Sequence, residues 1–565
     1  MPISYLLAAL LLTLPLWLGS QPRLLGYGAD SAMHLWFLNW FPYAISHGLN
    51  PFQTSIATHP STVSLLWNNA DLVLAFLAWP LFRLLPEAAA MDLVFLLMVA
   101  GAATAMAWQL RPHVRHASSA WLGGLLFGFS PFALSELAAG HLTWVSTATL
   151  PLGWWVGERA WRAAAHGRHA IRWGLALGLW AVLQYWVSKE LLATTLLMAM
   201  LLLILNSRRI LSRGLPPLRQ LWPVLAVAAA VFGALMAYPV ISQLTSGVPL
   251  SRPTVVSPTT NVVDLLEWVV PGYAQLMGIG PAGALSLRYT GELLETDAYL
   301  GLPLLVLAGL AAWRLRGAPL ARLGAGLAGV AGLLSLGGHL HVAGVVTRVP
   351  LPWLLFEHLP LLGKAVPSRF TIFVVAGVAC LLAAGWDRVM EQVAARTRAL
   401  ILGVVLLPLL PSSGLLAGLA GFPMYTPRVL GSTAVMSLPV GASVLTIPIT
   451  TRENHGLSMY WQAEAGFRYS QPFGYLLRPG PDGVLTDNLS PSPLANLATA
   501  LSSGDARPVG ISAAAVRLQL RQLGVRALVL MPSAQFAAEE EELRGVLGRS
   551  PELVDGAAVW LSPGG

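Results

Sequence analysis

Long apolar segments separated by short polar loops dominate the sequence up to about position 419. A helix needs roughly 20 apolar residues to cross a bilayer. We interpret eleven such segments as membrane spans and therefore expect a polytopic helical membrane protein; the segments are 3–18, 88–110, 118–134, 142–161, 171–187, 191–205, 221–240, 298–313, 320–336, 371–386 and 400–419.

The segment after the first apolar run has a different pattern. Its apolar residues recur every three or four positions, which predicts a helix with one apolar face; they are Met33, Trp36, Phe37, Trp40, Phe41, Ala44 and Ile45. Tryptophan and phenylalanine suit the headgroup boundary, so we expect this helix to lie on the membrane and to hold Asp30 near its plane. Pro42 should kink the helix, and the turn at 47–51 should end it.

The arginines indicate the topology, because cytoplasmic loops are enriched in Lys and Arg. With eleven spans, the basic loops, such as 111–116, all fall on one side, which gives a cytoplasmic amino terminus and an outer carboxyl terminus. The short apolar stretch 71–85, which contains Pro80 and Arg83, would reverse this order if it crossed, so we predict that it is a second interfacial segment. We interpret the first run as retained, since it lacks a basic start and a convincing cleavage site.

Composition supports a membrane protein. The 565 residues are 55% hydrophobic and 11% charged, and the mean hydropathy is +0.64, whereas about a quarter of the residues in a soluble domain are charged. The net charge of +8 could suggest nucleic acid, but the arginines cluster in loops between apolar runs, which favours membrane orientation instead. The single cysteine, Cys380, excludes a disulfide framework.

The outer side should carry the long loops, 241–297 and 338–369, and a final domain. From position 420 the apolar runs stop, and 444–448, 527–530 and 557–561 read as strands, with an amphipathic helix at 511–523. We therefore predict a transmembrane domain over 1–419 and an extracytoplasmic α/β domain over 420–565.

Three carboxylates stand just beyond the outer ends of predicted spans, namely Asp30, Glu136 and Glu190, and His141 follows Glu136 in its loop. Carboxylates at membrane depth usually face a cavity or a partner. Together they could bind a divalent ion and take a proton from a hydroxyl group. The simpler readings are that Asp30 caps a helix, that Glu136 and His141 are ordinary loop residues, and that Lys189 pairs with Glu190. The sequence contains no phosphate loop, HExxH or GxSxG motif.

One arrangement resembles a known family. A long outer loop that starts with Asp30, continues into an interfacial helix and then carries a Gly-x-x-Pro turn (48–51) and His59-Pro60 is similar to the GT-C superfamily of membrane glycosyltransferases. In this chain Asp30-Ser31 and His59-Pro60-Ser61 stand where the family often has two acidic residues and His-Pro-Pro.

The resemblance implies an inverting transferase that takes a sugar from a polyprenyl-phosphate carrier and gives it to a glycan or protein acceptor outside the cytoplasm. Asp30 and Glu136 would be catalytic, and a divalent metal such as Mg²⁺ or Mn²⁺ would be held by Asp30, Glu136 and His141. The donor phosphate would meet basic residues, for which Arg369 is the first candidate, followed by Lys189, Arg288 and Arg252. Acceptor or membrane lipid would contact Trp36, Trp40 and His59, although the tryptophans fit a membrane anchor better than a sugar platform.

A non-catalytic membrane protein, such as a lipid-carrier transporter or an assembly scaffold of the cell envelope, is the alternative. A transporter should show charged or broken segments in the middle of its spans. The spans of this chain are nearly free of charge at their centres, which favours the enzyme.

Overall fold

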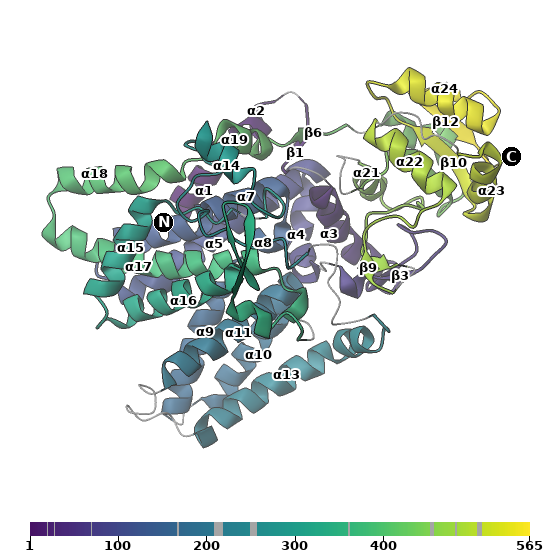
Figure 1. Ribbon diagram of the computed structural model, residues 1–565. Coiled ribbons are helices and arrows are strands. Elements are labelled where there is room, and N and C mark those ends of the chain that lie inside the picture. The colour runs from purple at the N-terminus through teal and green to yellow at the C-terminus, as the bar shows by residue number, and fades with distance from the viewer. Residues whose placement is uncertain are drawn as a thin grey trace. The chain divides into compact units, whose positions relative to one another are not determined.

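The computed structural model (Figure 1) describes the chain except for residues 20, 27–28, 69–70, 167–168, 208–217, 249–256, 296, 360–361, 426, 452–456, 481–482, 505–510 and 565. The chain forms two compact units. The first unit contains 1–18 and 93–421, and the second contains 19–92 and 422–565. The segment that follows the first apolar run thus folds together with the carboxyl-terminal residues.

Helices build the first unit. Their bounds are α1 (Pro2–Leu12), α2 (Leu14–Leu18), α5 (Glu87–Leu110, which begins in the second unit), α6 (Ala117–Phe129), α7 (Pro131–Ala139), α8 (Leu142–Val145), α9 (Thr149–Ala165), α10 (Ala170–Val187), α11 (Lys189–Leu205), α13 (Leu218–Leu244), α14 (Pro281–Ser286), α15 (Leu302–Arg314), α16 (Pro319–Ser335), α17 (Thr371–Gln392), α18 (Ala395–Leu406) and α19 (Ser413–Leu419). A hairpin of β4 (His339–Val342) and β5 (Val345–Pro350) joins them.

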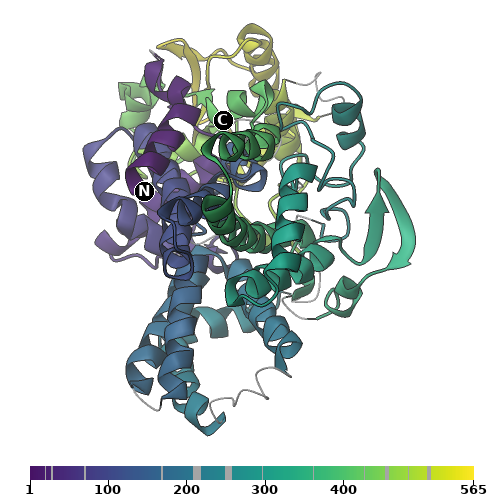
Figure 2. The ribbon, with the colours of Figure 1, turned by 90° about the vertical axis from the view of Figure 1, so that its left-hand side faces the viewer.

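The α17 helix forms the centre of this unit. It is apolar around most of its circumference, as expected of a helix that is buried on all sides, and it packs against α6, α15 and α16. Gly324 of α16 and Gly377 of α17 let the backbones approach closely, because a Cβ on either glycine would lie within 2.7 Å of the other's carbonyl oxygen. Figure 2 shows a second group, the blue to teal helices α9, α10 and α13, which pack side by side.

Fewer helices are long enough to span a membrane than the sequence predicted. Among the described residues, four stretches have the necessary length and apolarity, namely Glu87–His113, Ala117–Ala139, Gln220–Leu244 and Pro367–Gln392. The predicted span 142–161 is divided into α8 and α9, since Pro151 has no N–H to continue a helix from 142. The predicted span 400–419 is interrupted between α18 and α19, where Pro408 and Pro411 lie.

The second unit is a mixed α/β structure. Its main sheet has the order β11 (Glu552–Val554), β12 (Ala557–Leu561), β10 (Val525–Leu530) and β7 (Ser443–Ile447). Strands β7 and β10 are parallel, and the other pairs are antiparallel. The predicted strands are all present, and the predicted helix is α23 (Ala513–Gln522).

Helices and short strands complete this unit. The helices are α3 (Asp30–Ser46), α4 (Leu72–Leu84), α20 (Thr433–Met436), α21 (Ser458–Glu464), α22 (Pro493–Ser503) and α24 (Phe536–Leu547). The paired short strands are β1 (Arg23–Leu24) with β6 (Phe422–Pro423), β2 (Gln53–Thr54) with β3 (Val63–Ser64), and β8 (Arg478–Pro479) with β9 (Leu485–Thr486).

The aromatic face of α3 packs against protein. The helix ends at Ser46, before the predicted turn, and contains Pro42, but Trp36 and Trp40 are buried and stack on each other with centroids 5.2 Å apart. Nε1 of Trp36 donates a hydrogen bond of 2.7 Å to Gln462 of α21, and Phe467 meets the Trp36 ring edge-on. A buried indole needs such a partner. The expectation that this face lies on the membrane is therefore corrected, because α21 and Phe467 cover it.

Candidate functional site

A tight turn brings Glu136 and His141 together in the first unit. Ser130 caps α7 by accepting a hydrogen bond from the N–H of Ala133, and Pro131 suits the first turn. Gly140 then ends the helix with φ = 81°, a left-handed conformation that glycine adopts without strain. The N–H of His141 donates to the carbonyl of Glu136, and its Nδ1 lies 2.6 Å from Oε2 of Glu136.

Glu295 joins this pair from the loop before α15. One potential ligand atom from each of Glu136, His141 and Glu295 lies within 4.8 Å of the others. The Glu136 and Glu295 side chains are buried, and the His141 side chain is 17% exposed. Oε1 of Glu136 has no hydrogen-bond partner among the described residues. Burying a carboxylate oxygen without a hydrogen-bond partner costs free energy. A divalent cation bound by this Glu-His-Glu group would remove that cost, and the group offers the oxygen and nitrogen ligands that such a cation needs.

Arg369 ties two of the carboxylates of this region together. Its Nη1 donates to Glu190 at 2.6 Å, while Nη2 and Nε donate to the two oxygens of Glu295 at 2.7 and 3.0 Å. The guanidinium carbon lies 4.8 Å from the centroid of the Trp144 ring. Glu190 is fixed further by the backbone N–H of Val366. This planar, bidentate arrangement requires arginine.

Two more buried carboxyl groups lie in the loop 241–297. Asp297 accepts hydrogen bonds from Ser135, at 2.6 Å, and from Gln275. Glu267 accepts from the backbone N–H groups of Asp264 and Ala298. Burial raises the pKa of Asp297, and it raises the pKa of Glu267 well above its ordinary value. Because Ser135 precedes Glu136, the Ser135–Asp297 bond fixes α7 to the loop that carries Glu295.

Asp30 and His59 belong to the second unit. Asp30 is half-buried in the first turn of α3. One turn later His34 is buried, and its Nδ1 lies 2.5 Å from Oδ2 of Asp71, which precedes α4. The backbone N–H of His59 donates to the carbonyl of Gln471. The Trp36 and Trp40 side chains, as described above, are buried in this same unit.

The remaining basic candidates lie in the first unit. Lys189 begins α11, with its Nζ 5.7 Å from the centroid of the Tyr185 ring. Arg288 follows α14 and is exposed, and Arg252 lies outside the described residues. Of the predicted site residues, the structure thus brings Glu136, His141 and Arg369 into one cluster within the first unit.

Sequence reasoning did not select Glu295. One signal could have found it: Glu295 and Asp297 stand just before the apolar run 298–313, the same position relative to a predicted span that drew attention to Glu136.

Comparisons with known proteins identify the fold. No protein-family model matches the sequence, and no curated protein matches it. Among solved structures, the arabinofuranosyltransferase AftD from Mycobacteria aligns with 94% of this chain at 15% identity and a TM-score of 0.53, and the chain spans 36% of AftD.

The oligosaccharyltransferase of Archaeoglobus fulgidus also aligns. The alignment with its apo structure covers 97% of this chain and 71% of the oligosaccharyltransferase chain, at 12% identity and a TM-score of 0.49. The alignment with its complex with an inhibitory peptide and a dolichol-phosphate covers 97% of this chain and 72% of the oligosaccharyltransferase chain, at 13% identity and a TM-score of 0.45. The similarity to AftD, a GT-C glycosyltransferase, confirms that this chain has a GT-C-like fold.

Proposed function

We propose that this protein is a membrane glycosyltransferase that moves a sugar from a polyprenyl-phosphate carrier to a glycan or protein acceptor outside the cytoplasm. The buried Glu136–His141–Glu295 group in a GT-C-like fold supports this proposal most directly. We further propose a plasma-membrane location with a cytoplasmic amino terminus, a transmembrane domain over 1–419 and an outer domain over 420–565.

Asp30 is proposed as the general base. Its carboxylate would accept the proton of the acceptor hydroxyl while that oxygen attacks the anomeric carbon and the bond to the carrier phosphate breaks on the opposite face, which inverts the configuration. A metal held by Glu136, His141 and Glu295 would stabilise the negative charge that develops on the departing phosphate. The proposal that Asp30 acts with this group rests on the GT-C pattern, because the two lie in different units.

We propose a different role for Arg369 from the one its charge suggested. Its guanidinium is engaged by Glu190 and Glu295, so a donor phosphate would have to displace a carboxylate to bind it. We propose that Arg369 is a positioning residue that holds Glu295 toward Glu136 and His141. Lys189 and Arg288 remain the proposed contacts of the donor phosphate, and His59 the proposed contact of acceptor or lipid, since the Trp36 and Trp40 side chains are buried.

The test is a transfer assay with the purified full-length protein in lipid nanodiscs. A panel of polyprenyl-phosphate sugars is supplied with oligosaccharide and peptide acceptors, and the released polyprenyl phosphate is measured with and without EDTA. We expect release that depends on acceptor and that Mn²⁺ or Mg²⁺ restores after chelation. Translocation of the carrier without release of sugar from any donor would favour the transporter instead.

A further inference from the structure

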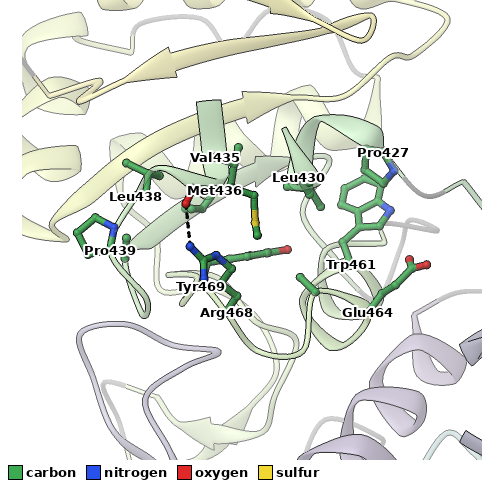
Figure 3. A pocket seen from close by; sticks show the side chains of 14 residues that line it. Pro427, Leu430, Val435, Met436, Leu438, Pro439, Trp461, Glu464, Arg468 and Tyr469 are labelled. Carbon is green, nitrogen blue, oxygen red and sulfur yellow. Dashed lines mark hydrogen bonds between the residues drawn. The ribbon is translucent and has the colours of Figure 1, made fainter. Parts of the chain in front are cut away.

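A pocket in the second unit lies apart from the carboxylates described above. Its volume is about 290 Å³, close to the lower end of the roughly 300–1,000 Å³ range of small-molecule sites. The walls come from the segment around α20, from the start of β7 and from the end of α21 with the residues that follow it. Figure 3 shows Leu430, Val435 and Met436 on one side of the pocket and Trp461 at one end.

One polar atom in the wall of this pocket has no hydrogen-bond partner among the described residues. The Tyr469 side chain is buried, and its hydroxyl group makes no hydrogen bond to any described residue. In Figure 3 this hydroxyl points across the pocket, toward the side where Leu430 and Trp461 lie. Buried tyrosine hydroxyl groups usually have a hydrogen-bond partner. The Tyr469 hydroxyl group could therefore donate a hydrogen bond to an acceptor atom of a ligand in this pocket.

The other polar side chains of the lining are Arg468, Trp461 and Glu464, and the first two donate hydrogen bonds to backbone carbonyl groups. Arg468 donates to the carbonyl oxygen of Met436 at 2.7 Å, as the dashed line in Figure 3 shows. Nε1 of Trp461 donates to the carbonyl oxygen of Tyr425, so this ring offers the pocket an apolar surface. The Glu464 carboxylate lies beyond Trp461 in the same view.

This lining selects for one kind of ligand. A sugar ring carries several hydroxyl groups, each of which would need a partner once buried, whereas the walls are formed mainly by Leu, Val, Pro and Met side chains. An aliphatic chain fits such walls, and the flexible Met436 side chain adapts to its shape. A single oxygen on that chain would satisfy Tyr469.

We propose that this pocket binds an aliphatic chain that carries one hydroxyl or carbonyl oxygen, with the chain against Leu430, Val435 and Trp461 and the oxygen accepting a hydrogen bond from Tyr469. None of the lining residues belongs to the proposed catalytic group. A free fatty alcohol and the ester of an acylated lipid share this chemistry.

The test uses three photoreactive probes with equal chain length and a diazirine group: an alcohol, a methyl ester and an alkane without oxygen. The full-length protein in detergent is labelled with each probe, and labelled peptides from 427–469 are quantified by mass spectrometry. The wild-type protein should label more strongly with an oxygen-bearing probe than with the alkane, by about threefold to tenfold for one added hydrogen bond. The alcohol and ester arms distinguish the two sources.

Three variants and one control decide the outcome. Tyr469→Phe should remove the preference for oxygen and keep labelling by the alkane, and Val435→Phe and the milder Ala442→Leu should lower all labelling by filling the pocket. Tyr289→Phe is the matched control, because Tyr289 also has a buried hydroxyl without a described partner but lies in the first unit. Three results would each overturn the proposal. They are equal labelling of the wild type by all probes, an unchanged preference for oxygen in Tyr469→Phe, and undiminished labelling in whichever of Val435→Phe and Ala442→Leu is folded.

Discussion

Glu136 and His141 face each other across the left-handed turn at Gly140, with Nδ1 of the imidazole 2.6 Å from Oε2 of the carboxylate. Local sequence produces this contact, since Pro131 suits the start of α7, Gly140 ends it, and the chain returns directly after Gly140. The partners that complete the cluster, Glu295 and Arg369, arrive from distant segments. The cluster is thus a local Glu–His pair to which tertiary structure adds a second carboxylate, that of Glu295.

The turn itself provides the first prediction. Gly140→Ala places a Cβ on a left-handed residue, which costs about 1–2 kcal/mol, and relief of that strain should separate His141 from Glu136. We expect Mn²⁺ affinity, measured by isothermal titration calorimetry, to fall together with the melting temperature. Gly548→Ala, at the left-handed end of α24 with φ = 71°, carries the same strain and should lower only the melting temperature. Equal metal affinity in both variants would contradict a role for this turn.

Arg369 should be indispensable for stability. Arg369→Met leaves Glu190 and Glu295 without their cation, and removing one partner of a buried pair costs roughly 3–5 kcal/mol. Arg388→Met is the control, because the Arg388 side chain is 53% exposed and pairs with Glu391 near the surface; such pairs contribute about 0–1 kcal/mol. Chemical unfolding measures both variants.

A double variant then tests whether unpaired charge is the cause of that loss. Adding Glu295→Gln to Arg369→Met removes one of the two stranded carboxylates, so part of the lost stability should return. If Arg369→Met unfolds no more easily than Arg388→Met, the ion pairs of Arg369 contribute little to the fold.

Glu267 should make stability depend on pH. Burial raises its pKa in the folded protein well above the ordinary 4.5, so the folded state holds this proton more tightly than the unfolded state does. The resulting stabilisation is complete below about pH 4.5 and is lost as the pH rises through the folded-state pKa. Glu267→Gln should therefore flatten the fall in melting temperature above pH 4.5. Glu391→Gln is the control, and an identical pH profile in wild type and Glu267→Gln would exclude this explanation.

The topology has its own test. A reporter fused after Leu419 should be active outside the cytoplasm, and one inserted in the basic loop 111–116 should be active inside, because positively charged loops stay cytoplasmic. An external signal from the loop 111–116 would mean that the segment 71–85, which forms α4, crosses the membrane.

The sequence pattern predicted those helices and strands whose positions depend on the residues within them. The period of the apolar residues located α3 and α23, and the apolar runs located β7, β10 and β12 of the main sheet but not β11. The same period could not show what covers the aromatic face of α3, because the covering residues, Gln462 of α21 and Phe467, lie more than 400 positions away in the sequence. Hydropathy also could not divide 142–161 or 400–419, where proline interrupts hydrogen bonding without reducing apolarity.

The site follows the same division. Glu136 and His141 could be selected because they are only five positions apart in the sequence, although Glu136 lies in α7 and not in the predicted loop. The contacts of Arg369 with Glu190 and Glu295 join residues more than seventy positions apart, and no short-range pattern encodes such pairs. A basic residue before a span therefore suggested a phosphate contact, whereas in the folded chain the surrounding carboxylates already engage it.

The central claim is that the protein transfers sugar with Asp30 as the base, and the most direct measurement is the transfer rate of Asp30→Asn in nanodiscs. The amide keeps the size of the side chain and removes its basicity, so the rate should fall by roughly 10²–10⁴-fold with the melting temperature unchanged. Asp555→Asn, an exposed turn residue of the same unit, should retain the wild-type rate. If the Asp30→Asn rate stays within about threefold of the wild-type rate, the decrease is far smaller than the loss of a general base would cause, and this result would contradict the account.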